Sequence, residues 1–499
     1  MKILSTKQIK EVDSKTIAYD GISSKTLMTR AVQAIYKYLK DNYLLQSKTN
    51  IICGVGNNGG DGIALAIELY NSGNDIKVYV IEHSKNYSPD FKHFLERATD
   101  RNIDIKMITS IEQLPTFPKS EIIIDAIFGT GLNREVTGLA LEVINKLNVN
   151  KALTISIDVP SGLMLNGPTT TAIKANRTIT LQIPKLALFL PDNHKYVGNL
   201  AIVNMGLSTK AINEAETTES YIDKEHIKSI IKPLNKYAHK GTQGHSLIIG
   251  GSIGKIGSVH LASKAALKSG CGLVTAYVPK CGTVPLQTSF PEAMVIEDIN
   301  EEFLSKINYL IYPNAIGIGV GMGTNDITKN AFIEFIKNNK SPMVIDADAI
   351  NIISEHKEIL ELLPQNTIIT PHPKELSRLV GDWSNDFEKI EKVTNIAKAY
   401  NIIVVIKGAH TLIITSEELY VNSSGTPALA TAGSGDVLTG IITGLLAQGY
   451  SALQAAKIGV YLHGLTANIS VTTINPRSFV ASDIIDNIGK AYFDIEGEG

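Results

Sequence analysis

Residues 51–66, with the sequence IICGVGNNGGDGIALA, join a short apolar run to an amphipathic run through a loop rich in glycine. A fully apolar run of this length before a helix is typical of a strand in a parallel sheet that is covered on both faces. The glycines let the backbone adopt positive φ and approach a ligand closely, and the loop also carries Asn57, Asn58 and Asp61. The stretch therefore predicts a strand–loop–helix unit of an α/β fold with a ligand at the loop.

Short apolar runs repeat this pattern along the chain, and helical stretches separate most of them. In the first half the predicted strands are 50–55, 76–81, 103–108, 121–126 and 152–158. In the second half they are 245–252, 272–278, 308–319, 341–348, 366–373 and 401–408, and the pattern after residue 435 is mostly helical. The alternation predicts mainly parallel sheets, the first in a Rossmann-like doubly wound domain. Because the polar segment 208–220 has no strand signal, we expect domains at residues 1–215 and 222–499.

The composition excludes several classes of protein. The 499 residues carry a formal net charge of −2, so no polycationic surface and no nucleic-acid partner are expected. The three cysteines, Cys53, Cys271 and Cys281, lack metal-ligand spacing, which indicates a reducing compartment without disulfides or a zinc site. No secretion signal is visible, and no run offers the roughly 20 mostly apolar residues that a membrane span needs. We expect a cytoplasmic protein, with no membrane partner, that forms a homo-oligomer.

Three polar, glycine-rich loops follow predicted strands of the first domain, at residues 56–62, 125–135 and 158–162. The carboxyl ends of parallel strands meet at one edge of a sheet, so these loops should share one site. Backbone N–H groups at the helix starts favour phosphate groups. Asp125 and Asp158 suit a cation, a sugar hydroxyl or acid–base work. One glycine turn alone is more often structural than functional, but three such loops on one edge predict a binding site.

The motifs GNNGGDG, DAIFGTGLNRE and IDVPSG, in this order, resemble the NAD(P)H-hydrate epimerase domain. The resemblance implies that Asp158 contacts the substrate and that Asn58, Asp125 and Ser161 surround a potassium ion. It also implies that the dinucleotide is held by Asn57, Asn58, Gly59, Gly60, Asp61, Gly129, Thr130, Gly131, Leu132, Asn133, Arg134 and Glu135. We assign the catalytic role to Asp125, with Asp158 left open as the alternative proton-transfer group.

A second glycine–aspartate loop, TAGSGDVLTGII at residues 431–442, opens a long apolar helix. Successive backbone N–H groups at the start of a helix can form an anion hole for a phosphoryl group in transfer. Asp436 stands in that first turn, where a carboxylate would repel phosphate. A general base that takes the proton from an attacking hydroxyl explains its presence. The alternative is an aspartate that only complements the helix dipole, which contributes about 0.3–1 kcal/mol.

Other polar residues follow further predicted strands of the second domain and favour the base assignment. They are Asp346, Asp348, His372, Lys407 and His410, together with the glycines Gly319, Gly321 and Gly323. Each residue alone has a common structural explanation: a histidine is often a satisfied structural group, and a loop lysine is often only solvated. Their shared place at the strand ends predicts a second site.

The motifs HKGTQGHSLIIGGS, IGVGMG, VIDADAIN, TPHPKEL, KGAHT, GTPALATAGSGDVLTGII and YLHGL resemble the ADP-dependent NAD(P)H-hydrate dehydratase, a ribokinase-like α/β domain. The resemblance implies that Gly321, His372 and Asp436 bind the hydrated dinucleotide, with Asp436 catalytic. The adenine nucleotide is expected at Lys407, Gly408, Ala409, His410, Thr411, Gly433, Ser434 and Gly435.

Taken together, the two resemblances imply repair of hydrated NADH and NADPH. The first domain would interconvert the R and S hydrates, and the second would dehydrate the S hydrate with ADP, giving NAD(P)H, AMP and phosphate. Potassium is expected in the first domain and Mg²⁺ in the second. The choice of ADP over ATP rests on the resemblance alone. The alternative is a kinase of a vitamin precursor or sugar, joined to a dinucleotide-binding scaffold domain without catalysis.

Overall fold

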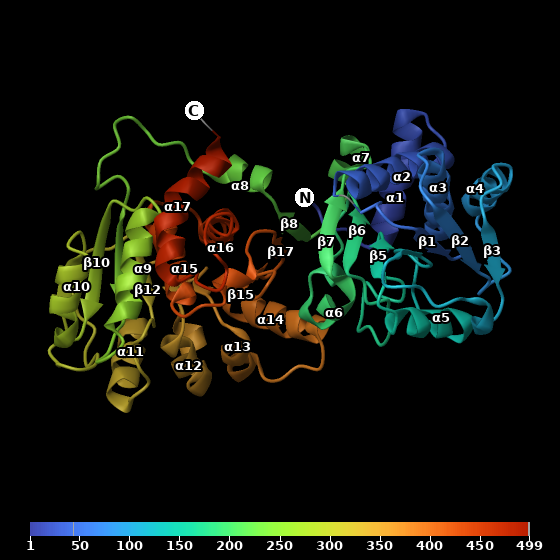
Figure 1. Ribbon diagram of the computed structural model, residues 1–499. Coiled ribbons are helices and arrows are strands. Elements are labelled where there is room, and N and C mark those ends of the chain that lie inside the picture. The colour runs from blue at the N-terminus through green and yellow to red at the C-terminus, as the bar shows by residue number, and fades with distance from the viewer. Residues whose placement is uncertain (43, 498–499) are drawn as a thin grey trace. The chain divides into compact units, whose positions relative to one another are not determined.

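The computed structural model describes residues 1–42 and 44–497, which form two compact units (Figure 1). One unit comprises Met1–Glu219 with Asn385–Phe387, and the other comprises Ser220–Ser384 with Glu388–Gly499. Each unit has its own sheet, one of seven strands and one of ten.

The first sheet is parallel throughout, which confirms the predicted strand–helix alternation. Its strands, in spatial order, are β3 (Ile105–Ile108), β2 (Ile76–Ile81), β1 (Thr49–Cys53), β4 (Ile122–Ala126), β5 (Leu153–Ile157), β6 (Arg177–Leu181) and β7 (Asn199–Val203). Its helices are α1 (Thr6–Asp20), α2 (Ser24–Asp41), α3 (Asn57–Asn71), α4 (Pro89–Thr99), α5 (Gly138–Asn148), α6 (His194–Val197) and α7 (Thr209–Glu214).

Both faces of the first sheet are buried, because successive side chains of a strand point to opposite faces. Ile51 and Cys53 of β1 belong to an apolar cluster with residues of α2, α3 and α4. Ile52, between them, belongs to a second cluster with Val143 and Ile144 of α5. Figure 1 shows α5 on the other side of the strands from α2 and α3. The doubly wound arrangement predicted for the first domain is thereby confirmed.

The second sheet has a parallel centre and an antiparallel end. Its strands, in spatial order, are β11 (Met294–Glu297), β10 (Leu273–Val278), β9 (His245–Ile249), β12 (Ala315–Ile318), β13 (Met343–Ile345), β14 (Ile368–Ile369), β15 (Ile403–Ile406), β16 (Leu412–Ile414), β17 (Leu419–Asn422) and β8 (Glu219–Ile222). Its helices are α8 (Lys224–Ile230), α9 (Ile256–Lys268), α10 (Thr283–Ser289), α11 (Asp326–Asn338), α12 (Asp348–Glu355), α13 (Pro373–Val380), α14 (Asp386–Tyr400), α15 (Ser434–Ala447), α16 (Ala452–Ser470) and α17 (Ala481–Glu496). The predicted α/β class is therefore confirmed for both units.

Helix α15 is buried along nearly its whole length, and its glycines let α9 pack against it closely. A Cβ atom at Gly440 would stand 2.1 Å from the carbonyl oxygen of Ala262, and one at Gly444 would stand 2.5 Å from that of Ala266. Real side chains cannot approach so closely, so the two helix backbones touch only because these residues are glycines. This packing fixes the start of α15, where Asp436 lies.

The prediction of a strand over residues 308–319 is wrong for its first half. Only β12 forms, while Leu310 is 95% and Tyr312 is 96% exposed. Pro313, which cannot donate a backbone hydrogen bond to a sheet, interrupts the apolar run. The prediction also omitted the strands β6, β7, β8, β11, β16 and β17. Several of these are short or mixed in polarity, so their sequences lack a clear apolar run.

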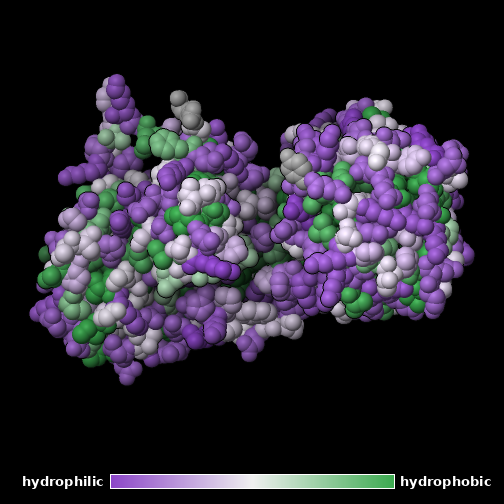
Figure 2. Space-filling model, viewed as in Figure 1, coloured by the Kyte–Doolittle hydropathy of each residue, from purple (hydrophilic) through white to green (hydrophobic). Residues whose placement is uncertain are grey.

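In the part of the chain that the structure describes, no helix is both long enough and apolar enough to cross a membrane. Figure 2 shows hydrophilic side chains interspersed with small apolar areas on the visible face of each unit. The apolar residues that give the chain its mean hydropathy of +0.07 are therefore largely those of the buried clusters.

Candidate active sites

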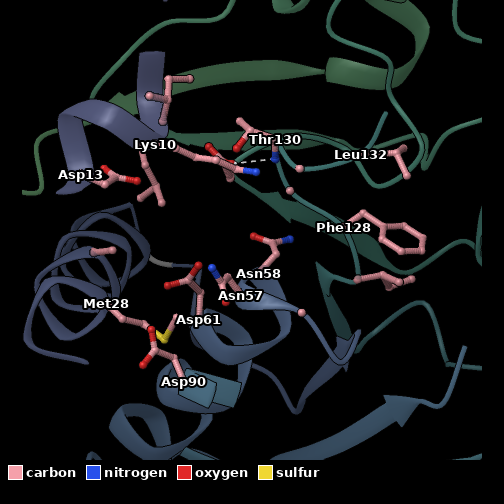
Figure 3. A pocket seen from close by; sticks show the side chains of 18 of the residues that line it. Lys10, Asp13, Met28, Asn57, Asn58, Asp61, Asp90, Phe128, Thr130 and Leu132 are labelled. Carbon is pink, nitrogen blue, oxygen red and sulfur yellow. Dashed lines mark hydrogen bonds between the residues drawn. The ribbon is translucent and has the colours of Figure 1, made fainter. Parts of the chain in front are cut away.

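A cavity of about 870 Å³ opens at the carboxyl ends of β1, β4 and β5 in the first unit (Figure 3). These three strands are neighbours in the sheet and run parallel, which is why the loops that follow them meet there. The first turn of α3 forms the floor, and α1 and α2 close one side. The sequence-predicted loops therefore converge on one site.

Most of the predicted dinucleotide residues line this cavity. They are Asn57, Asn58, Asp61, Gly129, Thr130, Gly131, Leu132, Asn133, Arg134, Glu135 and Asp158. Gly59 and Gly60 lie buried in the first turn of α3, outside the lining. A Cβ atom at Gly59 would stand 1.9 Å from the carbonyl oxygen of Gly54. This glycine therefore lets α3 begin tightly against the end of β1.

Asp125 lies beneath the cavity and does not line it. Its Oδ1 accepts hydrogen bonds from Ser161 Oγ at 2.5 Å and Ile127 N at 3.3 Å. Its Oδ2 accepts from Ser156 Oγ at 2.7 Å and Ser161 N at 2.9 Å. Burial raises the pKa of Asp125, while these four hydrogen bonds oppose the shift. The carboxylate thus ties together the loops after β4 and β5.

Asp158 faces the cavity and forms a buried ion pair. Its Oδ1 lies 2.7 Å from Lys185 Nζ, and the two side chains are 11% and 3% exposed. Lys185 also donates to Thr180 Oγ1 at 2.8 Å, and Asp158 Oδ2 accepts from Thr130 N at 3.3 Å, the dashed line in Figure 3. Asp158 has φ of +66°, a conformation that Asp and Asn tolerate better than other side chains. The carboxylate is therefore held in one orientation at the cavity wall.

The predicted potassium ligands have oxygen atoms, which suit a hard cation, but only some have spare capacity. Each oxygen of Asp125 already accepts two hydrogen bonds. These bonds occupy all the lone-pair positions with which a carboxylate can accept hydrogen bonds. Asn58 is 8% exposed, and its Nδ2 is a buried atom without a hydrogen-bond partner. Since the two ends of an amide are assigned from their partners, the opposite orientation would present the oxygen there. The set fits a cation through Asn58 and Ser161, and through Asp125 if one of its hydrogen bonds is exchanged.

In the second unit, the start of α15 stands over an ion pair. Lys407, after β15, lies 2.7 Å from Oδ1 of Asp346, after β13. Asp346 Oδ2 accepts from Thr439 Oγ1 of α15 at 2.7 Å. A Cβ atom at Gly435 would stand 3.4 Å from Lys407 Nζ. The lysine is thus held beside the first turn of α15, where an anion would be stabilised by the ammonium and by backbone N–H groups.

Asp436 is half-buried in that first turn. Burial raises its pKa to about 6, the charges of Asp346 and Asp348 add to the rise, and a hydrogen bond from Ser258 and the charge of Lys407 oppose it. A carboxylate with this pKa is ionised at neutral pH and still basic enough to accept a proton efficiently. The charge environment of Asp436 is compatible with the general-base role predicted for it.

The predicted residues His372 and Gly321 have clear structural contacts. His372 caps α13: its Nδ1 accepts from Lys374 N at 3.1 Å, and Glu375 Oε2 accepts from His372 N at 2.9 Å. Its ring remains 44% exposed at the end of β14. Gly321 has φ of +60°, and a Cβ atom there would stand 2.8 Å from the carbonyl oxygen of Lys255. Only glycine fits this turn after β12.

The remaining residues predicted to bind the nucleotide lie in two segments, the loop after β15 and the start of α15. Gly408 and Ala409 are exposed in the loop after β15, and Thr411 closes it through a hydrogen bond to the carbonyl of Gly408 at 3.3 Å. Gly433 has φ of +81° and caps α15. Ser434 lies 3.1 Å, Oγ to Nε2, from His463 of α16, whose pKa burial lowers to about 4. The neutral imidazole therefore anchors the first turn of α15.

Sequence reasoning missed three side chains that shape the sites: Lys185, Ser258 and His463. Lys185 carried a usable signal, because it is the only charged residue in the run LQIPKLALFL at residues 181–190. An isolated lysine in such a run must find a counter-ion when the run is buried. His463 belongs to the motif YLHGL, but it and Ser258 lie in helices, away from the strand ends at which the other residues were predicted.

Together, the two sheets define the class of protein: a two-domain α/β protein in which polar residues gather at the carboxyl ends of the strands of each domain. Two family models match separate parts of the chain. One, described as YjeF-related protein N-terminus, matches residues 24–187. The other, described as NAD(P)H-hydrate dehydratase, matches residues 246–490.

Relatives extend the match to nearly the whole chain. The bifunctional NAD(P)H-hydrate repair enzyme Nnr of Coxiella burnetii is 32% identical over 97% of this chain and 98% of its own length. The protein of the same name from Moorella thermoacetica is 30% identical over 94% of this chain and 92% of its own. The chain therefore belongs to the family of bifunctional NAD(P)H-hydrate repair enzymes. A solved structure of ADP/ATP-dependent NAD(P)H-hydrate dehydratase from Bacillus subtilis, co-crystallized with ATP/Mg²⁺, covers 56% of this chain and 99% of its own at 25% identity, with a TM-score of 0.47.

Proposed function

We propose that this chain repairs hydrated NADH and NADPH in two steps, with epimerisation at residues 1–215 and dehydration at residues 222–499. The observation that carries the proposal is the placement of Asp436 in the first turn of α15, beside the ion pair of Lys407 and Asp346. A base, a fixed cation and a helix start are the parts that phosphoryl transfer to a hydroxyl requires. Family membership over nearly the whole chain supports pairing this site with an epimerase site.

In the first domain, the cavity residues bind the dinucleotide and Asp158 contacts the hydrated ring. We place the contact with the reacting ring on Asp158 in preference to Asp125, because Asp158 lines the cavity and Asp125 lies beneath it. Asp125 would contribute, with Asn58 and Ser161, to the binding of K⁺. A bound K⁺ would supply positive charge that steadies the loop oxygens near the substrate.

In the second domain, the carboxylate of Asp436 takes the proton from the hydroxyl of the S hydrate. The hydroxyl oxygen bonds to the terminal phosphorus of ADP, the bond from that phosphorus to the bridging oxygen breaks, and AMP leaves. Phosphate then departs with the former hydroxyl oxygen as the ring nitrogen donates its electron pair. Loss of a proton from the neighbouring carbon restores the double bond of NAD(P)H. Lys407 and the N–H groups of α15 stabilise the charge on the phosphoryl group.

ADP as the phosphoryl donor is part of this proposal, with the nucleotide at residues 407–411 and 433–435, and the hydrated dinucleotide at Gly321, His372 and Asp436. Mg²⁺ would bind to the phosphate oxygens of the nucleotide and neutralise part of their charge. Asp346 and Asp348 already accept hydrogen bonds from Lys407 and Gly323 N, so the phosphates would provide most of its ligands. We propose further that the chain works in the cytoplasm as a homo-oligomer.

The function is tested by supplying the R and S hydrates separately to the purified full-length chain. With ADP and Mg²⁺, the S hydrate should regain the absorbance of reduced nicotinamide, and AMP and phosphate should appear in equal amounts. The R hydrate should also yield reduced nicotinamide, at a rate higher than its spontaneous conversion to the S hydrate allows. This rate should be lower when lithium replaces potassium. A stable phosphorylated product would instead identify a kinase, and an R hydrate that reacts only at its spontaneous rate would remove the epimerase assignment.

The pH dependence of the dehydration step should show one acidic limb near pH 6. Asp436 must be ionised to act as a base, and its pKa is about 6, so kcat should fall about tenfold for each pH unit below that value. The Ser258→Ala variant should move the limb to higher pH, because the hydrogen bond from Ser258 lowers the pKa of Asp436. The measurement is kcat with saturating S hydrate and ADP, with circular dichroism to check folding at each pH. A flat profile down to pH 4.5 would contradict the assignment.

A further inference from the structure

Helix α1 brings one carboxyl group, that of Asp13, to the cavity of the first unit. Ile9, Asp13 and Ile17 are spaced at four residues and all line the cavity, as residues on one face of a helix do. Figure 3 shows the side chain of Asp13 reaching from α1 toward the space above Asn57, Asn58 and Asp61. Among the described residues, the pKa of Asp13 is set by burial and by the charges of Asp158 and Lys185, and no hydrogen bond contributes to it. A carboxyl group that faces a cavity without a hydrogen bond of its own is available to a ligand bound there.

Burial and the neighbouring charges bring the pKa of Asp13 closer to neutral pH. Burial raises its pKa to about 6, the charge of Asp158 adds to the rise, and that of Lys185 opposes it. Asp61 of α3 has a raised pKa as well, from burial first and then from the charges of Asp158, Asp13 and Asp90. The other charged or titratable groups that line the cavity are Lys10, His83, Arg134 and Glu135, and burial lowers the pKa of His83. Asp158, in contrast, is paired with the ammonium of Lys185 at 2.7 Å.

A second observation indicates where the polar part of a ligand lies. Asn58 is 8% exposed, lines the same cavity, and has an Nδ2 atom without a hydrogen-bond partner. A Cβ atom at Gly129 would stand 3.2 Å both from Asn58 Cγ and from Asp158 Oδ2, so the amide and the carboxylate face one small region. A ligand with a polar group in that region would satisfy this amide, either directly or through the cation proposed above. Apolar side chains of α2, Leu27 and Met28, line the cavity beside Asp13.

We propose that Asp13 is a catalytic residue of the epimerase and donates the proton with which the hydroxyl of the hydrated ring leaves as water. This inference rests on the function proposed above. Two carboxyl groups in unlike environments can divide acid and charge-stabilising roles between them when burial raises the pKa of one of them, as it does for Asp13. Asp13 is the acid, and Asp158 is the anion that stabilises the cation formed on the ring.

The proposed step conserves atoms and electrons. The O–H bond of Asp13 breaks as its proton joins the hydroxyl oxygen of the substrate. The carbon–oxygen bond breaks with its electron pair on the departing water, and the ring nitrogen's lone pair forms a carbon–nitrogen double bond. Water then adds to the opposite face of that carbon, the nitrogen recovers its lone pair, the added water loses a proton to solvent, and the Asp13 carboxylate takes a proton back from solvent. The configuration is inverted without an oxidant or reductant.

The test is the Asp13→Asn variant of the full-length chain, assayed with the R hydrate, ADP and Mg²⁺. We expect the enzymatic R-to-S rate to fall by about 10²-fold, which is typical for loss of a general acid. The wild-type rate should decline as pH rises above about 6, because the acid must be protonated, and this decline should be absent from the residual rate of the variant. Dehydration of the S hydrate should be unchanged. Asp13→Glu, which keeps the carboxyl group, should recover part of the R-to-S rate, and that rate should again decrease as pH rises above about 6.

Asp90→Asn is the matched control, because Asp90 lines the same cavity, carries the same charge and is held by Ser24 Oγ at 2.9 Å. Its rate should stay within about twofold of wild type. If Asp13→Asn retains the wild-type rate and its decline above pH 6, the assignment of Asp13 is overturned while the epimerase function stands. If the wild-type chain itself fails to accelerate the R hydrate, the proposed function fails. An equal loss of the R-to-S rate in Asp13→Asn and Asp90→Asn would mean that the rate depends only on the total charge of the cavity. This result would also overturn the assignment of Asp13.

Discussion

Replacing Asp436 with asparagine is expected to lower kcat for ADP-dependent dehydration by about 10³-fold, within the range for loss of a general base. Asparagine keeps the size and shape of the side chain but cannot take the proton from the attacking hydroxyl. The anion site should survive, because Lys407 remains held by Asp346 and the backbone of α15 is unchanged. Binding of the adenine nucleotide should therefore be equal or tighter, since a negative charge beside the phosphates has been removed.

Asp348→Asn is the control for a purely electrostatic effect. The charge of Asp348 raises the pKa of Asp436, so its removal should move the acidic limb of the pH profile to lower pH and leave kcat at neutral pH nearly unchanged. Steady-state kinetics with the S hydrate and calorimetric titration with ADP separate catalysis from binding. Turnover by Asp436→Asn within tenfold of wild type would end the base assignment. Loss of ADP binding in the same variant would indicate a binding role instead.

The placement of the sites could be predicted because it depends on rules that act locally. Short apolar runs before glycine-rich loops indicated parallel strands, and parallel strands bring their carboxyl ends to one edge. On that basis alone, the loops after β1, β4 and β5 were expected together, and they line one cavity. The same rule placed Asp346, Lys407 and the start of α15 in one region, where the structure joins the first two by an ion pair.

The roles within a site could not be predicted because they depend on contacts distant in the sequence. Asp125 and Asp158 both follow buried strands and look equivalent as sequence. In the structure four donors, from strand β5 and from the loops after β4 and β5, surround Asp125, whereas Asp158 faces the cavity and Lys185. Asp13 lies in helix α1, which precedes the first strand of the sheet. The rule that ligands bind at the carboxyl ends of strands therefore did not predict a role for it. The strand predicted for the apolar run at 308–314 does not form, for a related reason. The apolar content of a run does not show whether a neighbouring strand is available to pair with it.

Replacing Asp158 with asparagine is expected to bring R-to-S conversion down to its spontaneous rate and to destabilise the first domain. Asparagine tolerates the positive φ of this position, so the backbone should persist. The ammonium of Lys185, 3% exposed, would keep only neutral acceptors such as Thr180 Oγ1. Leaving one charge of a buried pair without its partner costs about 3–5 kcal/mol. In a domain of this size that corresponds to a fall in Tm of roughly 6–20 °C.

A double variant separates stability from catalysis. Lys185→Met alone should also lower Tm, because it leaves the Asp158 carboxylate in the cavity wall without its cation. The combination of Asp158→Asn with Lys185→Met removes both charges, so it should recover much of the lost Tm, as replacement of a buried ion pair by uncharged groups often does. The epimerase rate should nevertheless remain at the spontaneous level, since the carboxylate that stabilises the cationic ring is absent. Dehydration of the S hydrate measures the second domain in every variant and should not change. Recovery of the epimerase rate together with Tm would show that Asp158 acts only as a structural partner of Lys185, and the assignment of the first site would have to move to another group of the cavity.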